Sequence, residues 1–195
     1  VTLALISSGI IPAVKAEVAD KSVDNPAGTT IDQGSGTMAV DLDNGNTFTI
    51  TNAGTISASG SNNNMYGINI DSTNTTVSTL TNSGTILGET TTTNRRRGRG
   101  INIASNASVG TLTNSGTITG QGRYYGGRGI YMVSTNGTLS SFINTSSGII
   151  QGISGEGIDG GQDTGGYVGY GAYLSASDSI STTFDNDGII RGLSD

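Results

Sequence analysis

The most regular feature of the chain is an apolar residue that recurs at a long and nearly constant interval. A glycine followed two residues later by isoleucine occurs five times, and successive copies are 30, 32, 32 and 40 residues apart. The pairs are Gly54 and Ile56, Gly84 and Ile86, Gly116 and Ile118, Gly148 and Ile150, and Gly188 and Ile190. Repeats of this length are typical of solenoids, propellers or modular arrays. We therefore expect the chain to repeat one structural unit.

Each repeat contains further apolar positions with the spacing of a strand. A second glycine, here called the second-phrase glycine, occurs in each repeat. The residues one and three places after it are apolar: Ile68 and Ile70, Ile101 and Ile103, Ile130 and Met132, Ala172 and Leu174. They alternate with Asn69, Asn102, Tyr131 and Tyr173, as in a half-buried strand. A weaker third phrase supplies Val77, Val109, Leu139 and Ile180. Each repeat thus predicts three short strands.

Residues before the first glycine complete the inward-facing set. Four positions before it stand Ile50, Leu80, Leu112 and Phe184, and in the fourth copy we expect Ile143, five positions before the glycine, to take the same place. Helical repeats need apolar residues at intervals of three and four, which are missing here. The pattern predicts an all-β fold, a right-handed parallel β-helix of about five coils, with like residues stacked about 4.8 Å apart.

Asparagine and glycine mark the turns of this predicted helix. Asn52, Asn82 and Asn114 precede the repeated glycine by two residues, and we expect their amides to hydrogen-bond along the stack. Ser146 and Asn186 are expected to take this place in the last two copies. The glycine is expected to adopt backbone angles that other residues avoid. The path from this glycine to the second-phrase glycine takes 13, 16, 13 or 23 residues and is predicted to carry the loops.

Composition narrows the function classes. The chain of 195 residues has 32 glycines, 12% charged residues, a net charge of −6, and neither cysteine nor histidine. The missing histidine removes the commonest general base and zinc ligand, so we expect no catalytic site, no metal and no cofactor. The acidic charge favours a soluble, secreted protein.

The N-terminal residues differ from the rest. Residues 1–16 are apolar, contain Pro12 and end in Val14, Lys15 and Ala16, which resembles the rear of a secretory signal peptide cleaved after Ala16. A buried N-terminal strand is the alternative. We expect residues 17–35 to form a lead-in or cap and residues 36–195 to form the β-helix, incomplete at its C-terminus.

The phrases "TNSGTI.G" and "GINI" behind this apolar start resemble the passenger domains of bacterial autotransporters, the type V secreted adhesins of Gram-negative bacteria. The resemblance covers about residues 36–192. It implies export through the periplasm, display at the cell surface or secretion, and attachment to the outer membrane by a C-terminal β-barrel. No barrel strands occur in this chain, so we expect it to be an N-terminal fragment.

A basic cluster is the strongest candidate binding site. Arg95, Arg96, Arg97 and Arg99 are expected in one loop and Arg123 and Arg128 in the equivalent loop of the next coil, joined by Tyr124 and Tyr125. Guanidinium groups beside aromatic rings suit polyanions such as sulfated glycans or lipopolysaccharide phosphate. An acidic secreted chain is a poor nucleic-acid binder. A solvated loop without a ligand is the simpler alternative.

Three other features carry less chemistry. The glycine-rich stretch from Gly152 to Gly171, with Glu156, Asp159, Asp163, Tyr167 and Tyr170, is a candidate glycan-binding loop or simply flexible. The sequence "DLDNGN" from Asp41 lacks the final glutamate of a calcium loop and predicts a tight turn at Asn44 and Gly45. Asp185, Asp187 and Arg191 are too few to define a catalytic site.

The expected function is therefore structural or adhesive. The resemblance implies a surface adhesin, associated with virulence, that presents loops to host cells, surface glycans or other copies of itself. The alternatives are a β-helical polysaccharide lyase or hydrolase and a glycan-binding matrix module.

Overall fold

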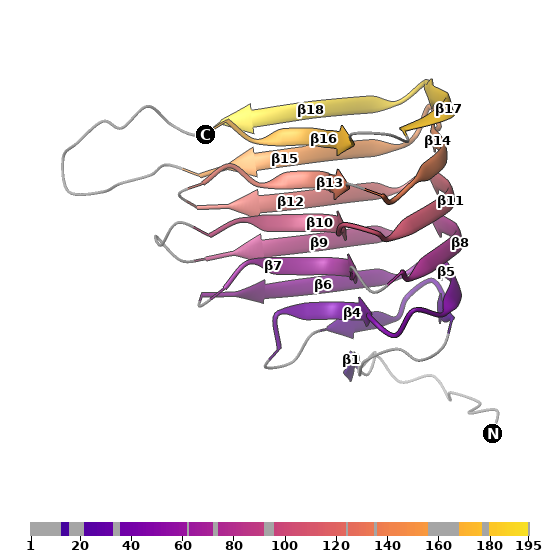
Figure 1. The fold of residues 1–195 in the computed structure, drawn as a ribbon. Helices are drawn as coiled ribbons and strands as arrows, with labels where there is room; N and C mark the ends of the chain where they lie inside the picture. The colour runs from indigo at the N-terminus through magenta and orange to yellow at the C-terminus, as the bar shows by residue number, and fades with distance from the viewer. Residues whose placement is uncertain are drawn as a thin grey trace.

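The computed structural model describes residues 13–15, 22–32, 36–61, 63–71, 74–91, 96–123, 125–134, 136–155, 168–176 and 180–194. Within these ranges the chain forms 18 β-strands and no helix, and the strands stack in layers from the N-terminus to the C-terminus (Figure 1). Among the described residues, none belongs to a helix that is long and apolar enough to cross a membrane.

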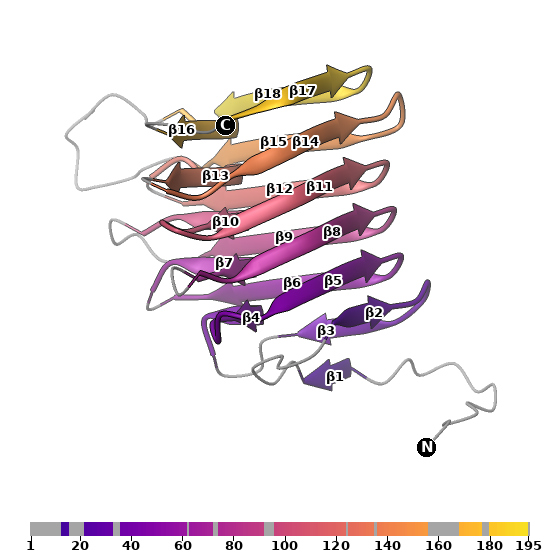
Figure 2. The ribbon, with the colours of Figure 1, turned by 45° about the vertical axis from the view of Figure 1, so that its right-hand side comes forward.

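The strands form three parallel sheets, here called A, B and C. Sheet A contains β1 (Ala13–Lys15), β3 (Thr30–Asp32), β6 (Thr55–Gly60), β9 (Thr85–Thr90), β12 (Thr117–Gly122), β15 (Ile149–Ser154) and β18 (Ile189–Ser194). Sheet B, which faces forward in Figure 2, contains β2 (Val23–Asn25), β5 (Thr47–Asn52), β8 (Thr76–Asn82), β11 (Ser108–Asn114), β14 (Leu139–Asn144) and β17 (Ile180–Asn186). Sheet C contains β4 (Met38–Leu42), β7 (Met65–Ile70), β10 (Gly98–Ile103), β13 (Arg128–Ser134) and β16 (Tyr170–Ala176).

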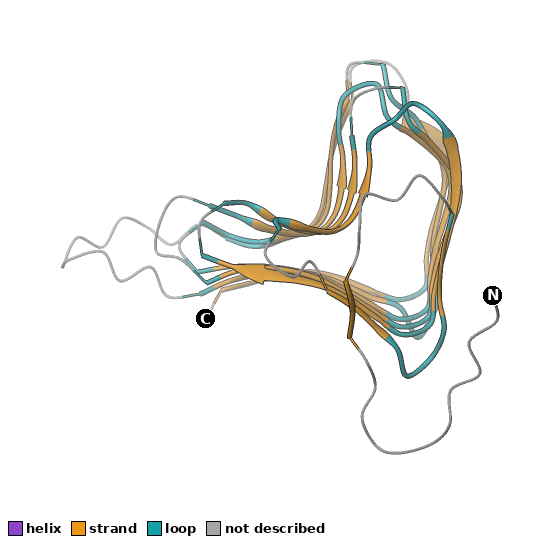
Figure 3. Ribbon diagram, turned by 90° about the horizontal axis from the view of Figure 1, so that it is seen from below, coloured by secondary structure: helices purple, strands orange, loops and turns teal. Residues whose placement is uncertain are grey.

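The chain visits the sheets in the order B, A, C and then repeats. Strands β2, β3 and β4 form the first coil, strands β14, β15 and β16 form the fifth, and β17 and β18 follow. Seen from below, the path turns clockwise as it recedes, so the helix is right-handed (Figure 3). The predicted right-handed parallel β-helix of three-stranded coils is confirmed. Strands β2 and β3 lie in the segment expected as a lead-in or cap, where they extend two of the sheets.

Columns of like apolar side chains fill the interior. Ile56, Ile86, Ile118 and Ile150 pair in register and have no exposed surface, and Ile190 continues the column at the top. Sheet C contributes a second column of Val40, Ile68, Ile101, Ile130 and Ala172. Because each buried isoleucine contributes about 1.5–3 kcal/mol, the stacked columns stabilise an otherwise polar chain. The predicted inward positions in these columns are confirmed.

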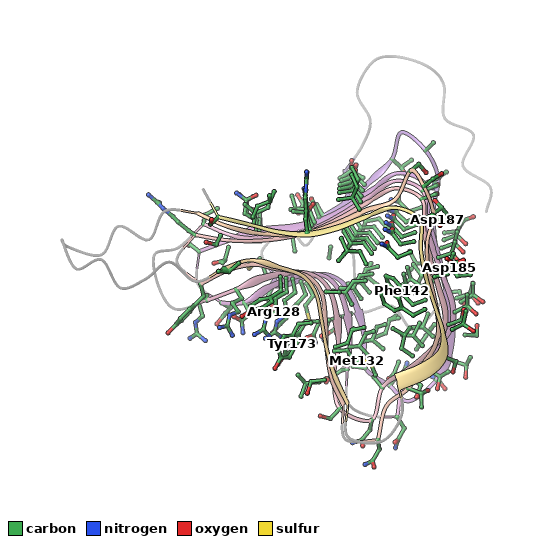
Figure 4. The ribbon with its side chains drawn as sticks, turned by 90° about the horizontal axis from the view of Figure 1, so that it is seen from above. Arg128, Met132, Phe142, Tyr173, Asp185 and Asp187 are labelled. Atoms are coloured by element: carbon green, nitrogen blue, oxygen red, sulfur yellow. The ribbon has the colours of Figure 1, made fainter. Side chains whose placement is uncertain are left out.

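The prediction for the fourth copy was wrong at one inward position. Phe142, not Ile143, pairs with Leu112 and with Phe184, and its side chain is 1% exposed. The rings of Phe142 and Phe184 stack with their centroids 4.7 Å apart. Figure 4 shows Phe142 inside the space that the sheets enclose. The turn after β14 has two more residues than the turns after β5, β8, β11 and β17, which displaced the count from the glycine.

Every sheet B strand ends in an asparagine, and these asparagines form a ladder whose members are buried except for the last, Asn186. The side chains of Asn25, Asn52, Asn82, Asn114, Asn144 and Asn186 are joined in this order by amide hydrogen bonds of 2.7–2.8 Å. The predicted column is therefore confirmed for Asn52, Asn82, Asn114 and Asn186. Ser146 was wrongly placed in it: the residue in register is Asn144, and Ser146 is exposed in the turn.

The repeated glycines are needed for space, not for unusual backbone angles. Among the described glycines only Gly28 and Gly45 have a positive φ, so the expected special angles at the repeated glycine are not found. A Cβ on Gly84 would instead collide with the carbonyl oxygen of Gly54 in the coil below, and one on Gly116 would collide with that of Gly84. The coils therefore touch backbone to backbone at this turn.

A second set of glycines brings sheets A and C into direct contact. A Cβ on Gly88, Gly120 or Gly152 of sheet A would collide with the backbone of Arg99, Arg128 or Tyr170 of sheet C. The two sheets consequently run close together along one arm of the cross-section (Figure 3). Sheet C is backed here by peptide groups instead of side chains, so residues on its outer side stand on a rigid support.

Candidate functional site

The outer side of sheet C carries two columns of aromatic and cationic side chains. Tyr66, Arg99, Arg128 and Tyr170 pair in register in the first column. Asn69, Asn102, Tyr131 and Tyr173 pair in the second, three residues further along the strands. We call Tyr66, Arg99, Arg128, Tyr131, Tyr170 and Tyr173 the Arg/Tyr face. Figure 4 shows Arg128 and Tyr173 pointing away from the core, whereas Met132 of the same sheet lies on the enclosed side.

The guanidinium of Arg128 contacts tyrosine rings of two neighbouring coils. Its central carbon lies 4.2 Å from the ring centroid of Tyr131, 4.5 Å from that of Tyr173 and 5.8 Å from that of Tyr170. The rings of Tyr131 and Tyr173 also stack on each other, with centroids 5.5 Å apart. Such cation–π contacts favour the charged guanidinium by about 0.5–2 kcal/mol each, depending on their hydration. The Arg128 side chain is held so closely that only 7% of the residue is exposed.

Arg99 is held by rings and by an amide. Its guanidinium lies 4.0 Å from the ring centroid of Tyr131 and 5.3 Å from that of Tyr66. One terminal nitrogen donates to Oδ1 of Asn102 at 2.9 Å. Tyr131 therefore touches both arginines, and the two columns form one continuous surface.

Behind Arg99, a chain of amides leads down the stack to a carboxylate. Asn102 donates to Oδ1 of Asn69 at 2.6 Å, and Asn69 donates to Oδ1 of Asp41 at 2.8 Å. Burial raises the pKa of Asp41, as do the neighbouring charges of Asp43 and Asp71, and the hydrogen bond from Asn69 opposes them. The hydrogen-bonded chain thus has a cation at its upper end and an acid at its lower end.

Among the described residues, no carboxylate contacts the guanidinium groups of Arg99 and Arg128. Burial, followed by the charge of Arg128, lowers the pKa of Arg97, and burial is also the main cause that lowers the pKa of Arg99. The Nε atoms of Arg99 and Arg128 are buried without a hydrogen-bond partner. Among the described residues, the contacts of these two guanidinium groups are with tyrosines and Asn102 and with no carboxylate.

The structure relocates part of the predicted basic cluster. Arg99 and Arg128 were expected in loops, which is wrong: they lie within strands β10 and β13. Arg97 stands beside the face, with its guanidinium 4.9 Å from the ring centroid of Tyr125. Arg96 and Arg123 are exposed. Arg95 and Tyr124 lie outside the described residues.

Sequence reasoning missed Tyr66, Tyr131 and Tyr173 as site residues, and it named Tyr170 only as part of the candidate glycan-binding loop. Tyr66, Arg99, Arg128 and Tyr170 each stand one residue before a second-phrase glycine, so their column was readable from the repeat. Tyr131 and Tyr173 had been placed correctly on the outer side of their strands but had not been connected with the arginines.

The weaker candidates resolve differently. The predicted turn at Asn44 and Gly45 is confirmed, since Gly45 has φ 73° and Asn44 Oδ1 accepts from the backbone of Asn46. Arg191 donates to Oε1 of Gln151 at 2.8 and 3.1 Å. Figure 4 shows Asp185 and Asp187 at the far side of the molecule from Arg128.

The predicted long loop lies only partly within the described residues. Its residues Glu156, Asp159, Asp163 and Tyr167 lie outside the described residues, whereas Tyr170 belongs to β16 and to the Arg/Tyr face. Within the described part of the chain, no group of three acidic side chains is arranged to hold a metal ion.

The described residues thus form a β-helix whose sheet C carries a cationic and aromatic outer face. No protein-family model matches the chain, and neither the curated proteins nor the solved structures contain a match.

Proposed function

We propose that the chain is an adhesive β-helix that acts outside the cell, as part of an autotransporter passenger. The observation that carries this proposal is the Arg/Tyr face, a fixed surface of cations and rings repeated over successive coils of a rigid stack. A surface of this kind makes many weak contacts at once, and rigid multivalent contact is the physical basis of adhesion.

Several sequence properties support an extracellular setting. The chain has no cysteine that would need protection during export, and its repeats resemble those of autotransporter passengers. Parallel coils add to one another by nearest-neighbour contacts, so a repeated chain can fold coil by coil after it emerges from a membrane. The proposal includes surface display or secretion from a Gram-negative bacterium.

The main alternative is a polysaccharide lyase or hydrolase, since parallel β-helices also support these activities. Such enzymes need a general acid or base within reach of the bound sugar. The nearest acid that the described contacts connect to Arg99 is Asp41, which is separated from it by two asparagine side chains. This arrangement favours binding over cleavage.

Adhesion and cleavage can be measured on the same preparation. Beads coated with the full chain should clump or attach to epithelial cells, and the effect should weaken as salt rises because exposed charges are screened. Reducing ends released from a panel of acidic polysaccharides are assayed in parallel. Clumping or attachment without release supports the proposal, and catalytic release of reducing ends would replace it with the enzyme.

A further inference from the structure

We propose that the Arg/Tyr face, together with Arg97, binds linear acidic polysaccharides whose sugars carry sulfate or carboxylate groups. This inference deepens the proposed adhesive function by naming a ligand class and a site. It rests on four properties that the described residues give the face: a cationic charge without a contacting carboxylate, a hydrogen-bond donor without a partner, exposed rings and a repeat along the helix axis.

The first property is charge. After burial, the charge of Arg128 lowers the pKa of Arg97, and the charges of Arg128 and Arg97 also lower the pKa of Arg99, although the whole chain has a net charge of −6. Like charges held in a partly buried cluster repel one another, and an anion placed among them removes this repulsion. A cationic cluster that contacts no carboxylate among the described residues, on a protein of acidic net charge, has the electrostatics of an anion-binding surface.

The second property is the set of hydrogen-bond donors. The faces of the Arg128 guanidinium are covered by rings, its Nε is buried without a hydrogen-bond partner among the described residues, and the residue is more than nine-tenths buried. A guanidinium has five N–H groups, and its planar fork matches the paired oxygens of carboxylate and sulfate groups. The stacking fixes Arg128 in advance, so little side-chain entropy is lost when the anion binds.

The third property identifies a sugar as the carrier of the anion. Tyr170 and Tyr173 are 46% and 37% exposed and meet edge to face, with centroids 5.8 Å apart. Exposed rings beside a cation present both an apolar platform and a charge. The C–H face of a pyranose stacks on such a ring while its acidic substituent reaches the guanidinium.

The fourth property is the repeat. Equivalent side chains of successive coils are about 4.8 Å apart along the axis, which is close to the length of one sugar unit in an extended chain. The Arg99 and Arg128 positions are in register on adjacent strands, with Tyr66 and Tyr170 below and above them. A polymer lying along this column meets a cation or a ring at each level, and its contacts add.

The rigid backing of sheet C suits this role. The backbones of Arg99, Arg128 and Tyr170 are in contact with Gly88, Gly120 and Gly152 of sheet A. Sheet C therefore has no room to move toward sheet A when a ligand binds to its outer side. Nucleic acid also combines phosphates with stacking surfaces, but the acidic net charge of the chain disfavours it. Single-stranded DNA is therefore a competitor that the experiment must include.

The test uses the full chain in solution and measures fluorescence anisotropy of labelled polymers. The probes are dextran sulfate for the sulfated class, polygalacturonate for the carboxylated class, neutral dextran, single-stranded DNA, and polyphosphate as an anion without sugar rings. We expect binding of one or both acidic polysaccharides, weakened by salt, and none of neutral dextran. Tighter binding of DNA or of polyphosphate than of both polysaccharides would overturn the proposed ligand class.

Matched variants locate the site. Arg97→Gln and Arg128→Lys should each weaken polysaccharide binding about tenfold, since each removes charge-assisted or bidentate hydrogen bonds. Arg191→Gln, which removes the same charge as Arg97→Gln from sheet A, should change affinity less than about twofold. Circular dichroism checks that each variant is folded. If Arg128→Lys fails to fold, the Arg97→Gln variant still tests the site, because Arg97 is only half-buried. Unchanged affinity in Arg97→Gln, or an equal loss in Arg191→Gln, contradicts the proposed site.

This experiment is independent of the adhesion assay. A chain that binds acidic polysaccharide in solution but does not make beads clump or attach keeps the ligand proposal and loses the adhesive function. A chain that makes beads clump without binding these polymers keeps the adhesive function and loses the ligand proposal.

Discussion

Asn82 donates a hydrogen bond from its Nδ2 atom to Oδ1 of Asn114 at 2.8 Å, and neither side chain has exposed surface. The same amide accepts from Asn52 at 2.7 Å and donates to the carbonyl oxygen of Gly84 at 3.2 Å. Asn82 therefore joins three coils and closes its own turn. Because the amides are inside the protein, water cannot replace a lost partner.

Replacing Asn82 by alanine should lower the free energy of unfolding by about 3 kcal/mol, because it removes buried hydrogen bonds and leaves Oδ1 of Asn114 without its donor. Urea unfolding followed by far-UV circular dichroism measures the change. Asn186→Ala is the matched control, since Asn186 is exposed and has a ladder neighbour on one side only among the described residues. Equal losses in the two variants would show that the ladder does not derive its strength from burial.

The fold was predictable because parallel stacking places equal residues at equal positions. Ile56, Ile86 and Ile118 share one environment, so the same side chain serves in each coil and the repeat is visible in the sequence. Counting from the glycine failed in the fifth coil because its turn has two more residues between the ladder asparagine and the glycine than the turn of the coil below. Counting from Asn144 would have placed Phe142 correctly.

The candidate site was only partly predictable. Arg99 and Arg128 each stand between two glycines instead of between apolar residues. Their strands therefore begin without the alternation of apolar and polar residues that marks a half-buried strand. Sheet A fills the space where an inward side chain would otherwise stand, which is why the alternation is missing. This close approach of two sheets is a tertiary contact and leaves only glycine as its local signal.

Gly116→Ala should be among the most damaging small substitutions in the chain. The added methyl group would collide with the carbonyl oxygen of Gly84, which is fixed by the turn of the coil below. We expect a loss of at least about 2 kcal/mol in the free energy of unfolding, or failure to fold, because a backbone atom cannot move aside as a side chain does.

Gly155→Ala is the control for this substitution. A Cβ at Gly155 would have its nearest contact at 3.4 Å, so we expect a change within about 0.5 kcal/mol. Urea midpoints of both variants, measured at the same pH and salt, test the difference. A mild effect in Gly116→Ala would mean that the coils can separate at the turn without cost.

Asp41→Asn should stabilise the protein at neutral pH. The pKa of Asp41 is raised, first by burial, so folding favours its protonated form. Its favourable contribution is therefore present at low pH and is lost as the pH rises through the raised pKa. Asparagine keeps the acceptor for Asn69 without the charge, so the variant should unfold at a higher temperature than the parent at pH 7.

The advantage of Asp41→Asn should shrink as the pH falls below about 3.9, the ordinary pKa of an aspartate, because Asp41 is then protonated in both folded and unfolded chains. Asp187→Asn removes one carboxylate from an exposed turn and controls for net charge. If it stabilises the protein as much at pH 7, reduction of the net charge, and not the burial of Asp41, explains the effect.

The turn between β14 and β15, in the fifth coil, has two residues more than the turn between β11 and β12, and the stack does not need them. Asn144 donates to the carbonyl oxygen of Gly148 across four residues, whereas Asn114 makes the same bond to Gly116 across two. Ser146 and Ser147 are exposed. Deleting Thr145 and Ser146 therefore recreates the order asparagine, serine, glycine of the neighbouring coil and keeps the ladder in register.

We expect this deletion to leave the free energy of unfolding unchanged or raise it by up to about 1 kcal/mol, because a shorter loop loses less conformational entropy on folding. Deleting Ile143 and Asn144 removes the same number of residues but takes an asparagine out of the ladder, so it should be strongly destabilising. Urea unfolding of both variants measures the contrast. A large loss in the first deletion would mean that the hydrogen bond from the Ser147 hydroxyl to the Ser115 carbonyl, at 2.9 Å, depends on the longer turn and supports the coil.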